Sequence, residues 1–193
     1  MERCHYRWSG AALALGLLLC APALAQMGQV SALRGAASAL RATGAVALDV
    51  EAPVFRGDTL RVAARPVDSQ LEVRLTDGSL LRVDAGAELL LIDYAPDQPE
   101  GVLDLIRGHV WLEVKRTFSR RRNAFRVRTR HGVAGVQGTR FGIDSRTERT
   151  LFKVFEGRVS VSGRDGRQIR VLTDGDSLVL DARGVVTAPV TDP

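Results

Sequence analysis

The sequence predicts an all-β protein, built from many short strands in a β-solenoid-like or a twisted double-sheet (sandwich) arrangement. Apolar and polar residues alternate in short runs throughout the chain, which is the pattern of half-buried strands. Glycine-containing turns, above all Asp-Gly pairs, separate these runs. Beyond the N-terminal segment, no long stretch has the 3.6-residue apolar period of a helix, which argues against alternating strands and helices.

The first element is an N-terminal segment that directs export. Arg3 and Arg7 precede an apolar run at residues 11–20, and small residues lead up to Ala25. A positive start, an apolar centre and a small-residue cleavage site are the three parts of a secretory signal peptide. The run is shorter than the roughly 20 residues that span a bilayer. We expect residues 1–25 to form a helical signal peptide, cut between Ala25 and Gln26, and the mature protein to be periplasmic.

Both cysteines, Cys4 and Cys20, lie in this segment. Its removal would leave a chain without a thiol, which excludes disulfides, cysteine-zinc sites and thiolate nucleophiles. Export without disulfides is more typical of the bacterial periplasm than of small secreted eukaryotic domains. Two alternatives stay open: an uncleaved anchor, and a lipoprotein attached through Cys20, although Leu19 is not the small residue that lipidation requires.

Residues 26–56 form the next segment, which is alanine-rich and could form a helix instead of strands. Gly35 and Gly44 interrupt it, and the pieces at 31–34 and 38–41 are similar to each other. Glycine weakens a helix interior. We therefore predict two short strands joined at Gly35.

Residues 57–163 carry the clearest strand pattern and form the predicted domain core. The runs at 71–75 and 80–83 flank Asp77-Gly78, the strongest signal for a two-residue hairpin. Further strands are predicted at 89–92, 102–106, 110–114, 125–129, 151–155 and 159–161. Residues 164–193 contain three more turn signals, at 165–166, 174–175 and 183–184. We expect them to form a C-terminal β extension with a frayed tail.

Five short motifs between residues 57 and 159 resemble those of the FecR domain, the periplasmic part of bacterial regulators of iron uptake. Each is weak alone, but the five in this order are specific: Asp77-Gly78-Ser79, Leu105-x-x-Gly108-x-Val110, Phe125-x-Val127-x-Thr129, Val136-x-Gly138-Thr139-x-Phe141 and Val154-x-Glu156-Gly157-x-Val159. The better-known regulators have a cytoplasmic anti-sigma segment and a membrane helix before this domain. A cleavable signal stands in their place here, so the chain resembles a stand-alone exported member.

The resemblance implies a non-enzymatic binding or signalling module, in envelope or iron-uptake regulation, that contacts an envelope protein and needs no cofactor. The alternative is an envelope scaffold, or a module that binds a glycan or another anionic surface. We do not expect nucleic acid as a partner, because the protein is exported and no aromatic stacking platform accompanies its basic residues.

The chain is basic, with 27 Lys+Arg against 22 Asp+Glu and a net charge of +5. A basic cluster is the candidate docking site for an anionic lipid, an acidic glycan or an acidic partner surface. The alternative is a solvated hairpin tip. If Arg126 and Arg128 alternate along a strand, they share one face. The candidate residues are Lys115, Arg116, Arg120, Arg121, Arg122, Arg126 and Arg128.

The sequence offers little for metal binding or catalysis. His109 and His131 would need a further ligand to hold zinc; Asp104 or Asp144 could serve, but no spacing motif indicates either. No Gly-x-Ser-x-Gly motif is present. We therefore expect no metal site and no catalytic residue.

Gly138-Thr139 has two interpretations. The Thr139 hydroxyl could attack the Gly138 carbonyl and cleave the chain, with His131 as a base. The simpler interpretation is that Thr139 stabilises a turn while Phe141 packs in the core. Trp111 and Phe141 could line a ligand groove, but an aromatic residue in an alternating strand is more often part of the core.

Overall fold

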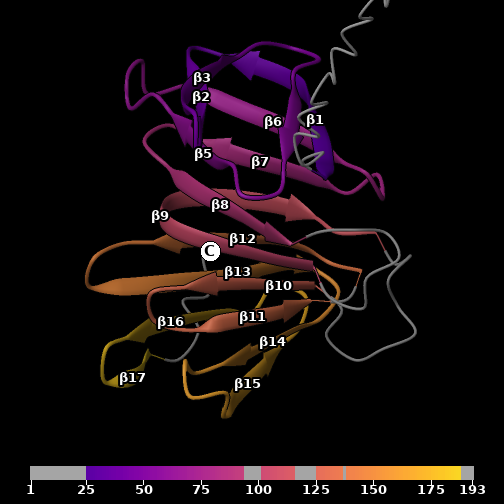
Figure 1. Cartoon of the computed structure of the whole chain (residues 1–193). Coiled ribbons are helices and arrows are strands. Elements are labelled where there is room, and N and C mark those ends of the chain that lie inside the picture. The colour runs from indigo at the N-terminus through magenta and orange to yellow at the C-terminus, as the bar shows by residue number, and fades with distance from the viewer. Residues whose placement is uncertain (1–24, 94–100, 116–124, 137, 188–193) are drawn as a thin grey trace, which may run out of the picture.

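The computed structural model describes residues 25–93, 101–115, 125–136 and 138–187. In these ranges the chain forms seventeen β-strands and no helix (Figure 1), which confirms the all-β prediction. The predicted signal helix lies outside the described residues. The strands are β1 (Gln26–Arg34), β2 (Ala37–Arg41), β3 (Gly44–Leu48), β4 (Pro53–Phe55), β5 (Thr59–Val62), β6 (Gln70–Leu75), β7 (Leu80–Asp84), β8 (Glu88–Asp93), β9 (Gly101–Glu113), β10 (Phe125–Thr129), β11 (Val133–Val136), β12 (Arg140–Ser145), β13 (Arg149–Glu156), β14 (Val159–Ser162), β15 (Gln168–Leu172), β16 (Ser177–Asp181) and β17 (Gly184–Thr187).

Strand pairing links all seventeen strands, and the chain alternates between two groups that share β9. The first group holds β1, β4, β6, β7, β12, β13, β16 and β17. The second holds β2, β3, β5, β8, β10, β11, β14 and β15. In Figure 1 the N-terminal strands lie at one end of the stack and the C-terminal strands at the other.

The pairing is antiparallel wherever the described strands meet, except between β9 and β10, which are parallel. Stacked solenoid coils would pair in parallel, so this pattern departs from the solenoid-like alternative. The reason is local: tight glycine turns return the chain antiparallel to itself. The turn at Asp77-Gly78 is one example, since β6 and β7 form the hairpin that the sequence predicts.

β9 passes from one group of strands to the other. Its first half pairs with β8 and β10, and its second half pairs with β7 and β12. Gly108 lies at the changeover with φ 90°. A Cβ there would lie 2.5 Å from the Cα of Ala87. The prediction of two separate strands here was wrong, because glycine lets one continuous strand change partners without a break.

Apolar side chains from both groups pack into one core. Its largest members are Phe125, Phe141 and Phe152, each no more than 1% exposed. The core position expected for Phe141 is therefore confirmed. Trp111 is different: it is half-buried, and the Arg82 guanidinium lies 5.3 Å from the centroid of its ring. The core interpretation of Trp111 was wrong, because its neighbours Val110 and Leu112 occupy the inward positions.

Residues 26–56 pair directly with the rest of the sheet. As predicted, two strands meet at Gly35, which has φ 75°. β1 pairs with β6 and β2 pairs with β5. The buried carboxylate of Asp58 binds Arg41 through both oxygens, at 2.9 and 3.0 Å. The N-terminal segment thus completes the sheet that the following residues build.

Among the described residues, no helix has the length and apolar character needed to cross a membrane.

Candidate functional site

The basic residues of β10 lie on one face of the sheet. Phe125, Val127 and Thr129 are buried, whereas Arg126 and Arg128 point outward. Alternation along a strand produces this arrangement, because successive side chains leave opposite faces. β10 therefore anchors itself in the core with its apolar residues and presents arginines to solvent.

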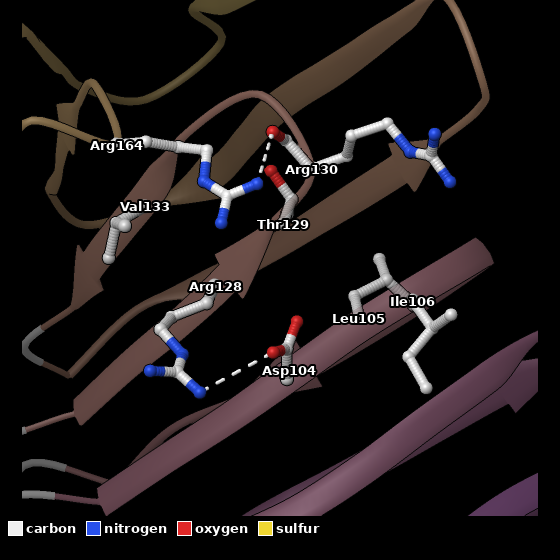
Figure 2. A pocket seen from close by; sticks show the side chains of 8 residues that line it. All are labelled: Asp104, Leu105, Ile106, Arg128, Thr129, Arg130, Val133 and Arg164. Atoms are coloured by element: carbon white, nitrogen blue, oxygen red, sulfur yellow. Dashed lines mark hydrogen bonds and ion pairs between the residues drawn. The ribbon is translucent and has the colours of Figure 1, made fainter.

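A hollow of about 520 Å³ lies beside Arg128 (Figure 2). Figure 2 shows the Arg128 guanidinium pointing toward Asp104 of β9, at 3.4 Å from a carboxylate oxygen. Arg164, from the turn between β14 and β15, donates to the Arg130 carbonyl at 3.5 Å. Thr129 and Val133 also line the hollow. Arg128 thus contacts the carboxylate, and Arg164 lines the same hollow from a distant part of the chain.

A second hollow, of about 320 Å³, adjoins the first and shares Val133 and Arg164 with it. Gly135 of β11 lies opposite Arg126 of β10 on one side and Ser160 of β14 on the other. The Ser160 hydroxyl donates to the Gly135 carbonyl at 3.1 Å. Arg126 and Arg164 both line this second hollow.

The chemistry of this surface suits anions. Guanidinium groups present planar pairs of N–H donors that match carboxylate, phosphate and sulfate oxygens. The surrounding positive charge also affects His131: burial first, and then Arg130, lower the pKa of this histidine below its ordinary value. We name the outer surface made by Arg126, Arg128, Asp104 and Arg164 the arginine face.

The structure gathers only part of the predicted basic cluster. Arg126 and Arg128 lie together on the arginine face, while Lys115 follows the opposite end of β9 from Asp104. Arg116, Arg120, Arg121 and Arg122 lie outside the described residues, so their role stays a prediction. Sequence reasoning missed Asp104 and Arg164 as neighbours of these arginines. No local signal could have found Arg164, because the long-range pairing of β11 with β14 brings it there.

Three of the five motifs lie at one end of the first strand group. The residues beside them form a row across four strands: Leu80, Glu113, Arg140 and Glu156. Asp77-Gly78-Ser79 directly precedes this row, Gly138-Thr139 precedes Arg140, and Gly157 follows Glu156. The other two motifs supply the Gly108 bend and strand β10. These positions indicate a role in building the turns.

The Asp77 carboxylate closes the β6–β7 turn. It accepts hydrogen bonds from the Ser79 amide at 2.8 Å and the Ser79 hydroxyl at 2.6 Å. The Ser79 hydroxyl oxygen in turn accepts the Lys115 amide at 3.0 Å. One motif therefore ties the hairpin to the end of β9. Gly78 has φ 81°, a conformation that favours glycine.

Thr139 is buried in a second junction. Its hydroxyl donates to the Arg158 carbonyl at 3.0 Å, and its amide donates to the Val114 carbonyl at 3.2 Å. A Cβ at Gly157 would lie 2.8 Å from the Gly138 carbonyl oxygen. Glycine is thus required where the two turns touch.

The candidate base for self-cleavage does not lie at this junction. His131 Nδ1 is 2.9 Å from the Thr150 hydroxyl. Thr150 pairs with Ser145, at the end of β12 remote from Thr139. Arg140 and Ser145, at the two ends of β12, are five residue steps apart, or about 17 Å. His131 is therefore too far away to take a proton from Thr139.

His109 pairs with Asp84 rather than with the carboxylates considered for zinc. Its Nδ1 lies 2.5 Å from an Asp84 oxygen. Asp144 lies across from His109 in the β9–β12 register, whereas Asp104 belongs to the arginine face. No group of three or more metal-ligating side chains gathers within the described ranges.

Comparisons with known proteins agree with this architecture. Two crystal structures of a candidate anti-sigma factor from Parabacteroides distasonis share the fold. One has 18% identity and a TM-score of 0.54, and it covers 68% of this chain and 59% of that chain. The other has 19% identity and a TM-score of 0.52, and it covers 63% and 56% respectively. The chain thus spans less than two thirds of either protein.

The sequence matches no curated protein. A family model, described as FecR protein, matches residues 58–160. This match includes all the motif residues from Asp77 to Val159. It also includes the strands β9 to β13, among them β10 and the strands next to Thr139 and Gly157. The chain therefore belongs to the FecR protein family.

Proposed function

We propose that this protein is an exported, periplasmic regulatory module that acts by binding an envelope protein and has no catalytic role. FecR family membership is the observation that carries the proposal. The fold that the chain shares with a candidate anti-sigma factor supports a role in signalling. The signal-peptide pattern before Gln26 supports export, and the family resemblance points to envelope or iron-uptake regulation.

The mechanism would be recognition by a rigid surface. Tight turns and a continuous core hold the outward side chains in place, so a partner meets a surface that loses little conformational freedom on binding. The arginine face is the described surface with the clearest chemical preference, and it favours an acidic partner.

Transcript profiling of a deletion strain tests the proposal. We expect a defined set of transcripts to change on deletion, in iron-replete or iron-depleted medium. Wild-type protein should restore them. A variant with two arginines in the apolar run, Leu17→Arg with Leu18→Arg, should not, because it cannot be exported. An unchanged transcript profile would contradict a regulatory role.

A second candidate function is an envelope scaffold that binds an anionic polymer, and the arginine face favours it. Here deletion would weaken the envelope, measured as sensitivity to detergent, without a specific transcript response. The same strains therefore separate the two functions.

A further inference from the structure

The arginine face has a spacing that indicates what it binds. We infer that it is a docking site for an extended acidic segment of a partner protein, whose alternate carboxylates pair with Arg126, Arg128 and Arg164. This inference rests on the proposed function, because it specifies the chemistry of the protein partner.

The first argument is the distance between the arginines along β10. Arg126 and Arg128 are alternate residues on one face of the strand. Alternate positions in a strand are about 7 Å apart. An extended peptide repeats its own same-side side chains at this same distance. A segment with acidic residues at every second position, laid along β10, therefore brings one carboxylate to each arginine.

The second argument is the shape beside the strand. Arg126 and Arg164 both line the hollow of about 320 Å³. Arg164 lines this hollow and also the hollow next to Arg128. A carboxylate that enters either hollow meets a β10 arginine on one side and Arg164 on the other. Two guanidinium groups around one carboxylate satisfy more of its acceptor sites than a single arginine does.

The third argument is the carboxylate already present. Asp104 holds the Arg128 guanidinium at 3.4 Å, and its side chain is 34% exposed. This contact shows that a carboxylate fits at Arg128, and it keeps the guanidinium over the hollow (Figure 2). Asp104 also competes with an incoming carboxylate. Its neutralisation should therefore strengthen binding of an acidic segment.

A peptide fits these observations better than a sugar chain or a membrane. None of the described residues that line the two hollows is aromatic, so sugar rings have no stacking surface there. The hollows are recesses beside the strand, whereas a planar membrane meets protruding groups. An extended chain carries its charges on side chains that reach into such recesses.

Fluorescence anisotropy on the full-length protein, as purified from the producing cells, tests the inference. The probe is a labelled nonapeptide of alternating threonine and aspartate, with four aspartates. The control is a threonine decapeptide with four aspartates, at its first, fourth, seventh and tenth positions, so that successive carboxylates leave different sides of an extended chain. We expect the alternating peptide to bind more tightly, and both to weaken at 1 M salt, where the Debye length falls to about 3 Å.

Charge-matched variants identify the surface. Arg126→Gln with Arg128→Gln should weaken binding of the alternating peptide about 2- to 30-fold, the range for two exposed ion pairs. Asp104→Asn should strengthen it about 2- to 5-fold. Arg34→Gln with Arg74→Gln removes the same charge from exposed positions on β1 and β6, which belong to the other group of strands. This control should change binding less than 2-fold, and thermal unfolding should show that every variant is folded.

Several results would overturn the inference. They are equal binding of the two peptides, equal loss in the two double variants, or binding only to vesicles of phosphatidylglycerol or to dextran sulfate. The proposed function can survive each of these results, because its transcript test does not depend on the arginine face. Conversely, selective peptide binding without a transcript response would retain the docking site and remove the regulatory role.

Discussion

The imidazole Nδ1 of His109 lies 2.5 Å from a carboxylate oxygen of Asp84 and joins β9 to β7. Gln70 donates to the other carboxylate oxygen at 2.8 Å. The hydrogen bond to Asp84 raises the pKa of His109, although burial acts in the opposite direction. The same bond, again against burial, lowers the pKa of Asp84.

These shifts predict a stability that depends on pH. The raised pKa of His109 stabilises the fold below the ordinary histidine value of about 6.5, and this stabilisation disappears as pH rises through the folded pKa. The lowered pKa of Asp84 stabilises the fold above about 3.9 and is lost at lower pH. His109→Gln should therefore lower the free energy of unfolding most between about pH 3.9 and about pH 6.5. The pair is half exposed and screened, so we expect at most about 1 kcal/mol.

Urea unfolding at pH 5.5 and pH 8.5 measures this effect. His131→Gln is the control. Burial lowers the pKa of His131, so its removal should raise the stability of the protein at acid pH. Loss of stability in His109→Gln that is equal at both pH values would contradict the prediction.

Gly108→Ala should destabilise the protein by about 3 kcal/mol. The substitution combines an unfavourable positive φ, worth about 1–2 kcal/mol, with a clash against the Ala87 backbone. Gly166→Ala is the matched control. It has φ 79° but nothing within 4 Å of the added carbon. Gly166→Ala should therefore cost only the roughly 1–2 kcal/mol of the unfavourable φ. Equal losses in thermal unfolding would show that the Gly108 bend has no packing constraint.

Arg41→Met should destabilise the fold by about 3 kcal/mol, because it leaves the Asp58 carboxylate buried without its cation. The Asp58 side chain is only 2% exposed. Arg34→Met is the comparison: Arg34 and Asp68 are 3.6 Å apart with exposed side chains, and its loss should stay within about 0.5 kcal/mol. Similar urea midpoints for the two variants would mean that Arg41 does not hold residues 26–56 to the domain.

Thr139→Ala should cost about 1 kcal/mol, the usual value of one hydrogen bond, because it removes the bond to the Arg158 carbonyl. Thr139→Ser should recover part of it. Intact mass of freshly purified wild-type protein should show no break between Gly138 and Thr139. A threonine-dependent pair of fragments at this bond would establish self-cleavage instead.

The accumulated protein should begin at Gln26. The pattern of Arg3, Arg7, the apolar run and Ala25 predicts this cut. N-terminal sequencing of the protein from the envelope fraction measures it directly. An intact Met1 would refute cleavage, and a lipid-modified Cys20 would favour the lipoprotein alternative.

The strands and most of their turns were predictable from local residue patterns alone. Alternation between inward and outward residues is visible within five residues, as in Phe125–Thr129, because the side-chain period of a strand is two. Glycine turns such as Asp77-Gly78 are equally local, since a positive φ concerns a single residue. The family motifs were readable for the same reason: they consist of such turns and alternations.

The pairing of strands that lie far apart in the sequence could not be predicted from local patterns. The change of partners within β9 depends on the strands that flank Gly108, and the half-buried position of Trp111 depends on which neighbours reach the core. The arginine face shows this most clearly. Arg126 and Arg128 were visible as a pair, but Arg164 joins them through the pairing of β11 with β14. Contacts between distant residues depend on the free energy of the whole fold, and no local pattern records them.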